Sequence, residues 1–201
     1  MDAIKLLTQD HRTVERLFKA YERAGDRAIK EKQRIAEQVI RELSIHASIE
    51  EQFLYPTARE LSDKLDSQVL EALEEHHVAK ATLAELEKLS PSDERFDAKM
   101  TVLMENIRHH VEEEEEDLFP KLERLMDRAD LAMLGEAMET AKDVAPTHPH
   151  PMSPDSPPGN FVSGALAKIL DSGKDLVRGT ARSARRAVTA RLSSARSRSS
   201  R

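Results

Sequence analysis

The first two thirds of the sequence contain one pattern twice. HASIEEQFLYP at 46–56 returns as HVEEEEEDLFP at 110–120, sharing a histidine, a glutamate at +4, an aromatic residue at +9 and a proline at +10. DHRTVERLFKAY at 10–21 likewise corresponds to EHHVAKATLAEL at 75–86, with apolar residues at +3, +7 and +10 from the first histidine. Two copies of one helical hairpin predict an antiparallel, up-down four-helix bundle with short loops.

Each part of the repeat carries a stripe of apolar residues at the 3–4 spacing of one helix face. The first stripe predicts a helix over roughly 2–24, and the second runs through 35–53 until Pro56 interrupts it. The third runs from about 66 to Ser90, and the fourth from Pro91 to Phe119, with Pro120 as a kink or an end. We expect a short extra helix over 130–142 to pack across one end of the bundle.

Composition agrees with an all-α fold and excludes several kinds of chemistry. Leu, Ala, Glu, Lys and Arg dominate, whereas aromatic residues make up 3% of the chain. Because the chain contains no cysteine, disulfides, iron-sulfur clusters and thiol catalysis are excluded. The sequence also lacks a signal-peptide pattern and an apolar run of about 18 residues, so we expect no transmembrane segment and a cytoplasmic location.

Charge divides the chain into an acidic and a basic part. Residues 1–144 contain 21 basic and 34 acidic side chains, a net charge of −13, whereas 165–201 contain 10 basic and 2 acidic side chains. Residues 145–164 between them are rich in proline. We therefore predict a folded domain over 1–144, an extended linker over 145–164, and a C-terminal tail over 165–201 that can form a basic amphipathic helix.

Six polar residues occupy positions where the helical stripes require large apolar side chains: His11, His46, Glu50, His76, His110 and Glu114. Each H-x-x-x-E pair places an imidazole and a carboxylate one turn apart on the same face, with Cβ atoms ~5–6 Å apart. Buried without partners, such groups would cost about 1–3 kcal/mol each. Imidazoles and bridging carboxylates are suited to two first-row metal ions ~3.5–4 Å apart, so we predict a dinuclear site.

Other assignments stay open at this point. The six groups could instead hydrogen-bond to one another or to water, because a buried histidine is often only a hydrogen-bonded core residue. For the third helix we prefer His76, which the repeat places opposite His11, and keep His77 as the alternative. Glu51 and Glu115 lie about 100° further round their helices, where they would support ligands from outside or lie on the surface.

The pattern H, HxxxE, H, HxxxE, together with RHHVEEEEEDLFP at 108–120, resembles the hemerythrin HHE cation-binding domain family over about residues 1–144. The resemblance implies a nonheme di-iron centre with an oxo or hydroxo bridge. It also implies that the four histidines bind end-on and that Glu50 and Glu114 bridge the two iron ions. Iron itself is inferred from this resemblance and not from the residues.

The sequence departs from respiratory hemerythrins at one ligand position. Those proteins carry a further histidine one turn after the histidine of the third helix, where this chain has Lys80. One iron should then have an open or water-filled position, unless a side chain such as Tyr55 reaches it. We therefore expect a protein that binds or reacts with O2, hydrogen peroxide or nitric oxide, with a weak catalase-like or peroxidase-like activity, and not a reversible oxygen carrier.

Two other functions are compatible with the sequence. The domain could store iron or donate it, or it could be a structural bundle whose basic tail binds a partner. For the tail we expect disorder or contact with the acidic domain first, and an anionic membrane surface second. Nucleic acid is less favoured, because no aromatic residue follows Phe161 to stack on bases.

Overall fold

The structure is a computed structural model, which describes residues 1–153 and is entirely helical over them apart from turns and loops. The α-helices are α1 (Ala3–Arg23), α2 (Ile29–Ile49), α3 (Tyr55–Leu61), α4 (Asp66–Leu86), α5 (Phe96–Glu113), α6 (Phe119–Leu125) and α7 (Arg128–Lys142). A π-helical turn, Glu50–Leu54, joins α2 to α3, and a second, Glu114–Leu118, joins α5 to α6. A 3-10 turn, Asp63–Leu65, precedes α4. The predicted all-α fold is confirmed.

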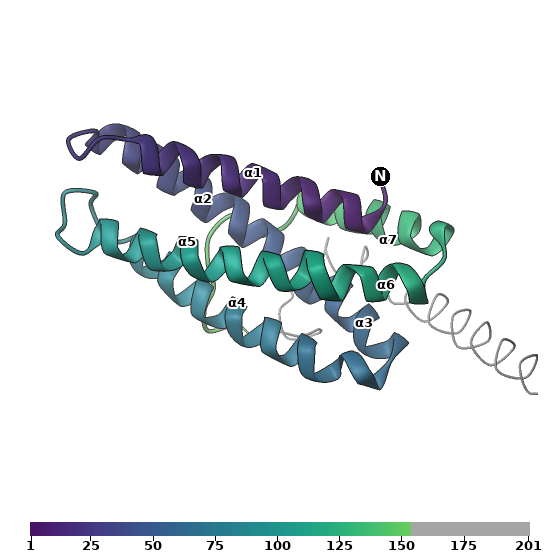
Figure 1. The fold of residues 1–201 in the computed structure, drawn as a ribbon. Helices are drawn as coiled ribbons and strands as arrows, with labels where there is room; N and C mark the ends of the chain where they lie inside the picture. The colour runs from purple at the N-terminus through teal and green to yellow at the C-terminus, as the bar shows by residue number, and fades with distance from the viewer. Residues whose placement is uncertain (154–201) are drawn as a thin grey trace, which may run out of the picture.

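The helices form an antiparallel four-helix bundle made of two hairpins (Figure 1). One hairpin is α1 followed by α2, and the other is α4 followed by α5. Their connections, residues 24–28 and 87–95, lie at one end of the bundle, whereas the N-terminus and α3, α6 and α7 lie at the other. The repeat in the sequence is thus a repeat of hairpins, as predicted.

The prediction that Pro56 ends the second helix was wrong, and so was the alternative that the fourth ends at Pro120. Both helices continue past their proline, to Leu61 and Leu125. In each, a π-helical turn comes first, in which Tyr55 N–H donates to Glu50 O and Phe119 N–H donates to Glu114 O. Each proline then stands in the first turn of the following α-helical segment, where its missing N–H costs little.

The fourth helix begins later than predicted, at Phe96 instead of Pro91. Residues 90–95 form turns, in which Asp93 N–H donates to Ser90 O at 2.8 Å and Arg95 N–H donates to the Asp93 carboxylate at 2.9 Å. These local hydrogen bonds compete with the helix, as short polar side chains commonly do. The proline therefore belongs to the connection between α4 and α5.

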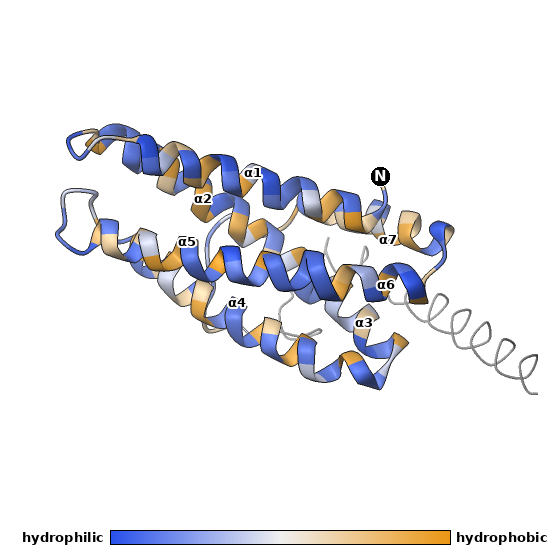
Figure 2. Cartoon of the chain, in the orientation of Figure 1, coloured by the Kyte–Doolittle hydropathy of each residue, from blue (hydrophilic) through white to orange (hydrophobic). Residues whose placement is uncertain are grey.

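Apolar residues on the inner helix faces form two clusters (Figure 2). One lies at the α3–α6–α7 end and includes Phe53, Tyr55 and Phe119, and the other lies toward the hairpin connections and includes Phe18 and Phe96. The predicted polar residues lie between the clusters, since each histidine separates residues of one cluster from residues of the other along its helix. A polar layer thus crosses the middle of an apolar core.

Helix α7 packs across the N-terminal half of α1, as predicted for the short extra helix. Asp127 caps it by accepting from the N–H groups of Ala129 and Asp130. Near its middle, Gly135 lies against the start of the chain, where an added Cβ would be 2.2 Å from Met1 O and 2.7 Å from Ala3 N. The helix can approach α1 this closely because the position has no side chain.

Gly135→Ala should therefore destabilise the domain, although alanine normally stabilises a helix interior by about 1 kcal/mol relative to glycine. We expect the clash to lower the free energy of unfolding by about 1–3 kcal/mol, seen as a lower Tm in thermal unfolding. The matched control is Gly25→Ala, because nothing lies within 4 Å of the Cβ that would be added there. Equal Tm values for the two variants would show that α7 does not pack as described.

The part of the predicted linker that the structure describes, residues 145–153, contains no helix and lies against α2 and α4. Pro149 is buried there, and the His148 imidazole contacts the Glu87 carboxylate at the end of α4. The remainder of the linker and the predicted amphipathic tail over 165–201 lie outside the described residues, and the division into three parts stays a prediction. Within 1–153, no helix combines the length and the apolar character needed to cross a bilayer.

Candidate metal centre

Each of the four long helices contributes one histidine to the polar layer: His11 from α1, His46 from α2, His76 from α4 and His110 from α5. All four are buried, with 3–6% of their surface exposed. They meet in two pairs, in which the Nε2 atoms of His11 and His46 are 3.2 Å apart and those of His76 and His110 are 3.1 Å apart. The structure thus brings together the four histidines that the repeat singles out.

Glu50 and Glu114 are the first residues of the two π-helical turns, and both are buried between the histidine pairs. Oε2 of Glu50 lies 3.1 Å from His46 Nε2 and 3.4 Å from His76 Nε2, so it reaches one histidine of each pair. Oε2 of Glu114 likewise lies 3.4 Å from His11 Nε2 and 3.7 Å from His110 Nε2. Both carboxylates are therefore placed to bridge two ions.

Four further carboxylates hold the outer nitrogens of the imidazoles. His11 Nδ1 donates to Glu115 at 2.8 Å, His76 Nδ1 to Glu51 at 3.0 Å, and His110 Nδ1 to Glu75 at 2.7 Å; these are hydrogen bonds. His46 Nδ1 faces Asp10 at 3.6 Å, which is longer than a hydrogen bond. Glu115 and Glu51 belong to the π-helical turns that follow α5 and α2, so three hydrogen bonds and this longer contact link each long helix, or the turn that extends it, to its neighbours. We call the four carboxylates, Asp10, Glu51, Glu75 and Glu115, the carboxylate ring.

For three of the four histidines, the ring decides which nitrogen can bind a metal. An imidazole that donates Nδ1–H to a carboxylate and remains neutral presents the lone pair of Nε2 to the interior. At the His76–His110 pair both Nδ1 atoms donate in this way, so two neutral imidazoles would place such lone pairs 3.1 Å apart, where they repel. In addition, neither oxygen of Glu50, nor Oε2 of Glu114, accepts a hydrogen bond from a described residue. Cations between these atoms would relieve both problems, so the residues fit a metal centre.

The ligand atoms divide into two groups, each with its members within 4.8 Å of one another. One contains His11, His46, Glu50 and Glu114, and the other contains Glu50, His76 and His110. Glu50 belongs to both. This arrangement is suited to two ions that share a carboxylate, as predicted, although the role of the six residues as ligands stays a prediction.

The pKa values of the two central glutamates move in opposite directions. Burial, followed by the negative charge of Glu114, raises the pKa of Glu50 well above its usual range. Burial also raises the pKa of Glu114, but the nearby histidines, first His110 and then His11, lower it by more. Without cations, the polar layer therefore stabilises the charged form of Glu114 but not that of Glu50. Positive ions would stabilise the charged form of both glutamates.

Burial also keeps the ligand form of two histidines available at neutral pH. It lowers the pKa of His46 to about 4 and also lowers that of His76, so both imidazoles are neutral. At His110, burial lowers the pKa but the charges of Glu114 and Glu75 raise it by more. The Tyr55 phenol has its pKa raised by burial and then by the charge of Glu114, so it retains its proton.

The two halves of the centre differ in their aromatic neighbour. Tyr55 is buried with its hydroxyl donating to Glu114 Oε1 at 3.0 Å and lying 3.2 Å from His76 Nε2, so it does reach the centre. Its counterpart in the repeat, Phe119, stacks on the His11 ring at 5.8 Å and brings no polar atom. His77, the alternative to His76, is exposed and is not brought to the site.

Lys80 stands where a further histidine was expected in respiratory hemerythrins. It is buried, and its ammonium group donates to both oxygens of Glu51, at 3.0 and 3.2 Å. Because Glu51 also accepts from His76 Nδ1, the lysine and the histidine share one buried carboxylate. The sequence analysis treated this position only as a missing ligand and did not predict the ion pair.

The sequence analysis also overlooked two members of the carboxylate ring, although the repeat contained a signal. Asp10 and Glu75 each precede a ligand histidine, and Glu51 and Glu115 each follow a bridging glutamate. The paired acidic positions in both copies could have predicted a layer of supporting carboxylates. What the repeat could not show is that each of them reaches a histidine on a neighbouring helix.

Comparison with known proteins identifies a hemerythrin-type family and two similar proteins. The family described as "Hemerythrin HHE cation binding domain" matches residues 2–122. An uncharacterized hemerythrin-like protein of Schizosaccharomyces pombe is 26% identical over 170 residues, covering 84% of this chain and 83% of that protein. A DNA nickase of Nostoc is 30% identical over 122 residues, which are 59% of this chain but 33% of the nickase.

A solved structure has a similar fold. It is the crystal structure of a hemerythrin HHE cation binding domain-containing protein from Mycobacterium kansasii, with a TM-score of 0.61 and 23% sequence identity. The similarity covers 72% of this chain and 86% of that one. At this level of identity, the likeness concerns the arrangement of helices.

Proposed function

Because the chain belongs to the hemerythrin HHE cation-binding domain family, we propose that its bundle holds two iron ions and binds or reacts with O2, hydrogen peroxide or nitric oxide. We further propose a weak peroxide-decomposing activity and a cytoplasmic role in the response to oxidative or nitrosative stress. The observation that carries the proposal is the set of four Nε2 atoms facing inward around two buried carboxylates, of which three oxygens accept no hydrogen bond from a described residue.

Iron, when bound, would supply an exchangeable coordination position and two accessible oxidation states. The side chains of the protein would bind the ions, orient the ligands and exclude water. The four histidines and the two glutamates would hold the ions, and the carboxylate ring orients the imidazoles. The apolar clusters above and below the layer exclude bulk water. The Tyr55 hydroxyl donates to Glu114 with its oxygen 3.2 Å from His76 Nε2, and so places a proton donor at one end of the centre only.

The proposal is tested on the full chain isolated without chelators or metal supplements. We expect elemental analysis to find two iron atoms per chain and expect nitric oxide and hydrogen peroxide each to change the visible spectrum. Fewer than one iron per chain after anaerobic reconstitution, or two irons that respond to none of the three molecules, would refute it. Iron that passes within minutes to a strong chelator would favour the alternative of an iron donor.

The contacts around the ligands argue against a donor. Every proposed ligand has at most 6% of its surface exposed, and three of the imidazoles are hydrogen-bonded from outside. Nicking of DNA is not carried over from the Nostoc protein, because this chain covers 33% of it and residues 1–144 have a net charge of −13. Such a charge repels DNA phosphates.

A further inference from the structure

A small cavity of about 20 Å³ lies beside the four histidines. Besides these ligands its wall contains mainly apolar side chains, among them Val14, Leu43, Ile107 and Val111. A space of this size holds about one water molecule. The cavity is thus the place next to the centre where a small molecule can stand.

On two opposite sides, the cavity shares its wall with a space that opens to the surface. Toward α1 and α5 lies a groove of about 580 Å³, and His11, Val14, Ile107 and Val111 line both the groove and the cavity. Toward α2 and α4 lies a pocket of about 40 Å³, and Ala47 and Lys80 line both the pocket and the cavity. The repeat relates the two walls, since Val111 follows His110 as Ala47 follows His46.

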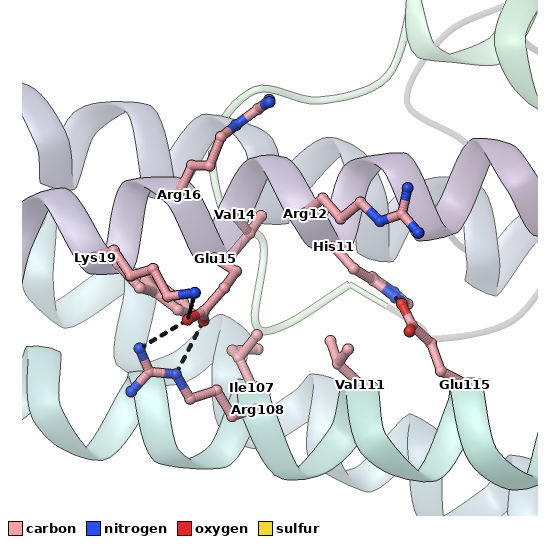
Figure 3. Close-up of a pocket in the computed structure, with 11 residues that line it drawn as sticks. His11, Arg12, Val14, Glu15, Arg16, Lys19, Ile107, Arg108, Val111 and Glu115 are labelled. Carbon is pink, nitrogen blue, oxygen red and sulfur yellow. Dashed lines mark hydrogen bonds and ion pairs between the residues drawn. The ribbon is translucent and has the colours of Figure 1, made fainter.

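The two sides differ in what covers them. On the α2–α4 side, Lys80 and Glu51 form a buried ion pair, and residues 146–153 lie over the pocket with Pro149 buried. On the α1–α5 side the groove is wide, and Ile107 and Val111 stand on α5 facing α1, between the Arg108–Glu15 contact and the Glu115–His11 contact (Figure 3). Of the three side chains in this wall, Val111 is the one that is partly exposed.

We propose that the wall formed by Val14, Ile107 and Val111 is the gate through which small neutral molecules pass from the α1–α5 groove to the metal centre. The proposal rests on the proposed function and concerns the route by which O2, nitric oxide and hydrogen peroxide reach the centre. Passage between aliphatic side chains costs these neutral molecules less hydration than it would cost an anion.

The gate is tested with Val111→Phe, which adds volume at the partly exposed position, and with Ser44→Val as the control on the opposite side, since Ser44 lines the pocket there but not the cavity. Iron-loaded, reduced protein is mixed with nitric oxide in a stopped-flow instrument. We expect Val111→Phe to slow the absorbance change at least tenfold while leaving the iron content unchanged. Ser44→Val should stay within twofold of the natural protein. Equal rates for Val111→Phe and the natural protein, or slowing by Ser44→Val instead, would overturn the proposal.

A second measurement does not depend on bound iron. The chain has two tyrosines and no tryptophan, so Tyr21→Phe leaves Tyr55, beside the centre, as the single fluorophore. In this background Val111→Ala should increase the rate at which dissolved O2 quenches Tyr55 fluorescence by about twofold or more, whereas Val111→Leu should decrease it. Unchanged quenching in both would overturn the gate even if the centre reacted with nitric oxide, and changed quenching would support it even if the centre held no iron.

Discussion

Glu50→Met is expected to abolish the binding of both metal ions and, at the same time, to make the metal-free protein more stable. Glu50 belongs to both groups of ligand atoms, so its loss leaves each ion without a carboxylate that it needs. In the metal-free protein, however, Glu50 is a fully buried carboxyl group with no hydrogen-bond donor among the described residues. Methionine replaces it with an apolar side chain of similar length, which removes this cost of about 1–3 kcal/mol.

The measurement is elemental analysis together with calorimetry in the presence and absence of a chelator. We expect a fall from two ions per chain to fewer than 0.2, a Tm above that of chelator-treated natural protein, and no response of this Tm to added metal. Glu116→Met, an exposed position in the same π-helical turn as Glu114, is the control and should retain both ions. A Glu50→Met protein that still bound two ions would exclude Glu50 as a bridge.

Glu51→Ala should cause the largest loss of stability, whereas the equivalent change Glu115→Ala should have little effect. Both glutamates accept Nδ1–H of a ligand histidine, at 3.0 Å from His76 and 2.8 Å from His11. Only Glu51 is itself buried and also accepts from a buried lysine, Lys80. Removing the carboxylate takes away the two hydrogen bonds that this ammonium group donates to Glu51, and breaking a buried ion pair costs about 3–5 kcal/mol.

Chemical denaturation of metal-free protein separates the two variants. We expect a loss of about 3–5 kcal/mol for Glu51→Ala and less than about 1 kcal/mol for Glu115→Ala, whose side chain is 37% exposed. Glu51→Met combined with Lys80→Met should recover most of the loss, because apolar side chains then replace the whole pair. If Glu51→Ala and Glu115→Ala were equally stable, the Lys80–Glu51 pair would contribute nothing to the fold.

The repeat was enough to predict the bundle and to single out the residues that meet at its centre. A histidine in an apolar stripe must point inward, and four helices of one design bring four such histidines to one level, as His11 and His76 illustrate. The rule that a proline ends a helix gave a wrong prediction, because Pro56 and Pro120 follow π-helical turns. In such a turn a backbone N–H donates to the carbonyl five residues earlier instead of four. No spacing of apolar residues distinguishes such a turn from a helix end.

Pairing across helices was the part that the sequence could not show. The spacing of Lys80 from His76 places both on one helix face, but only the arrangement of α4 beside the π-helical turn after α2 brings the lysine to Glu51. Residues 146–153 cover one side of the cavity. A proline-rich segment has no periodic pattern of apolar residues, so the sequence does not predict where it packs. The sequence shows that Tyr55 has a hydroxyl group where its counterpart in the repeat, Phe119, has none. That this hydroxyl group lies at the metal centre is shown only by its distance to His76.

The contacts of the carboxylate ring join neighbouring helices through side chains alone. The bundle should accordingly keep its shape when it is emptied of metal. In a cell short of iron, emptied molecules would then resist proteolysis and accumulate. They could be refilled when supply returns, so the amount of working protein would recover without new synthesis.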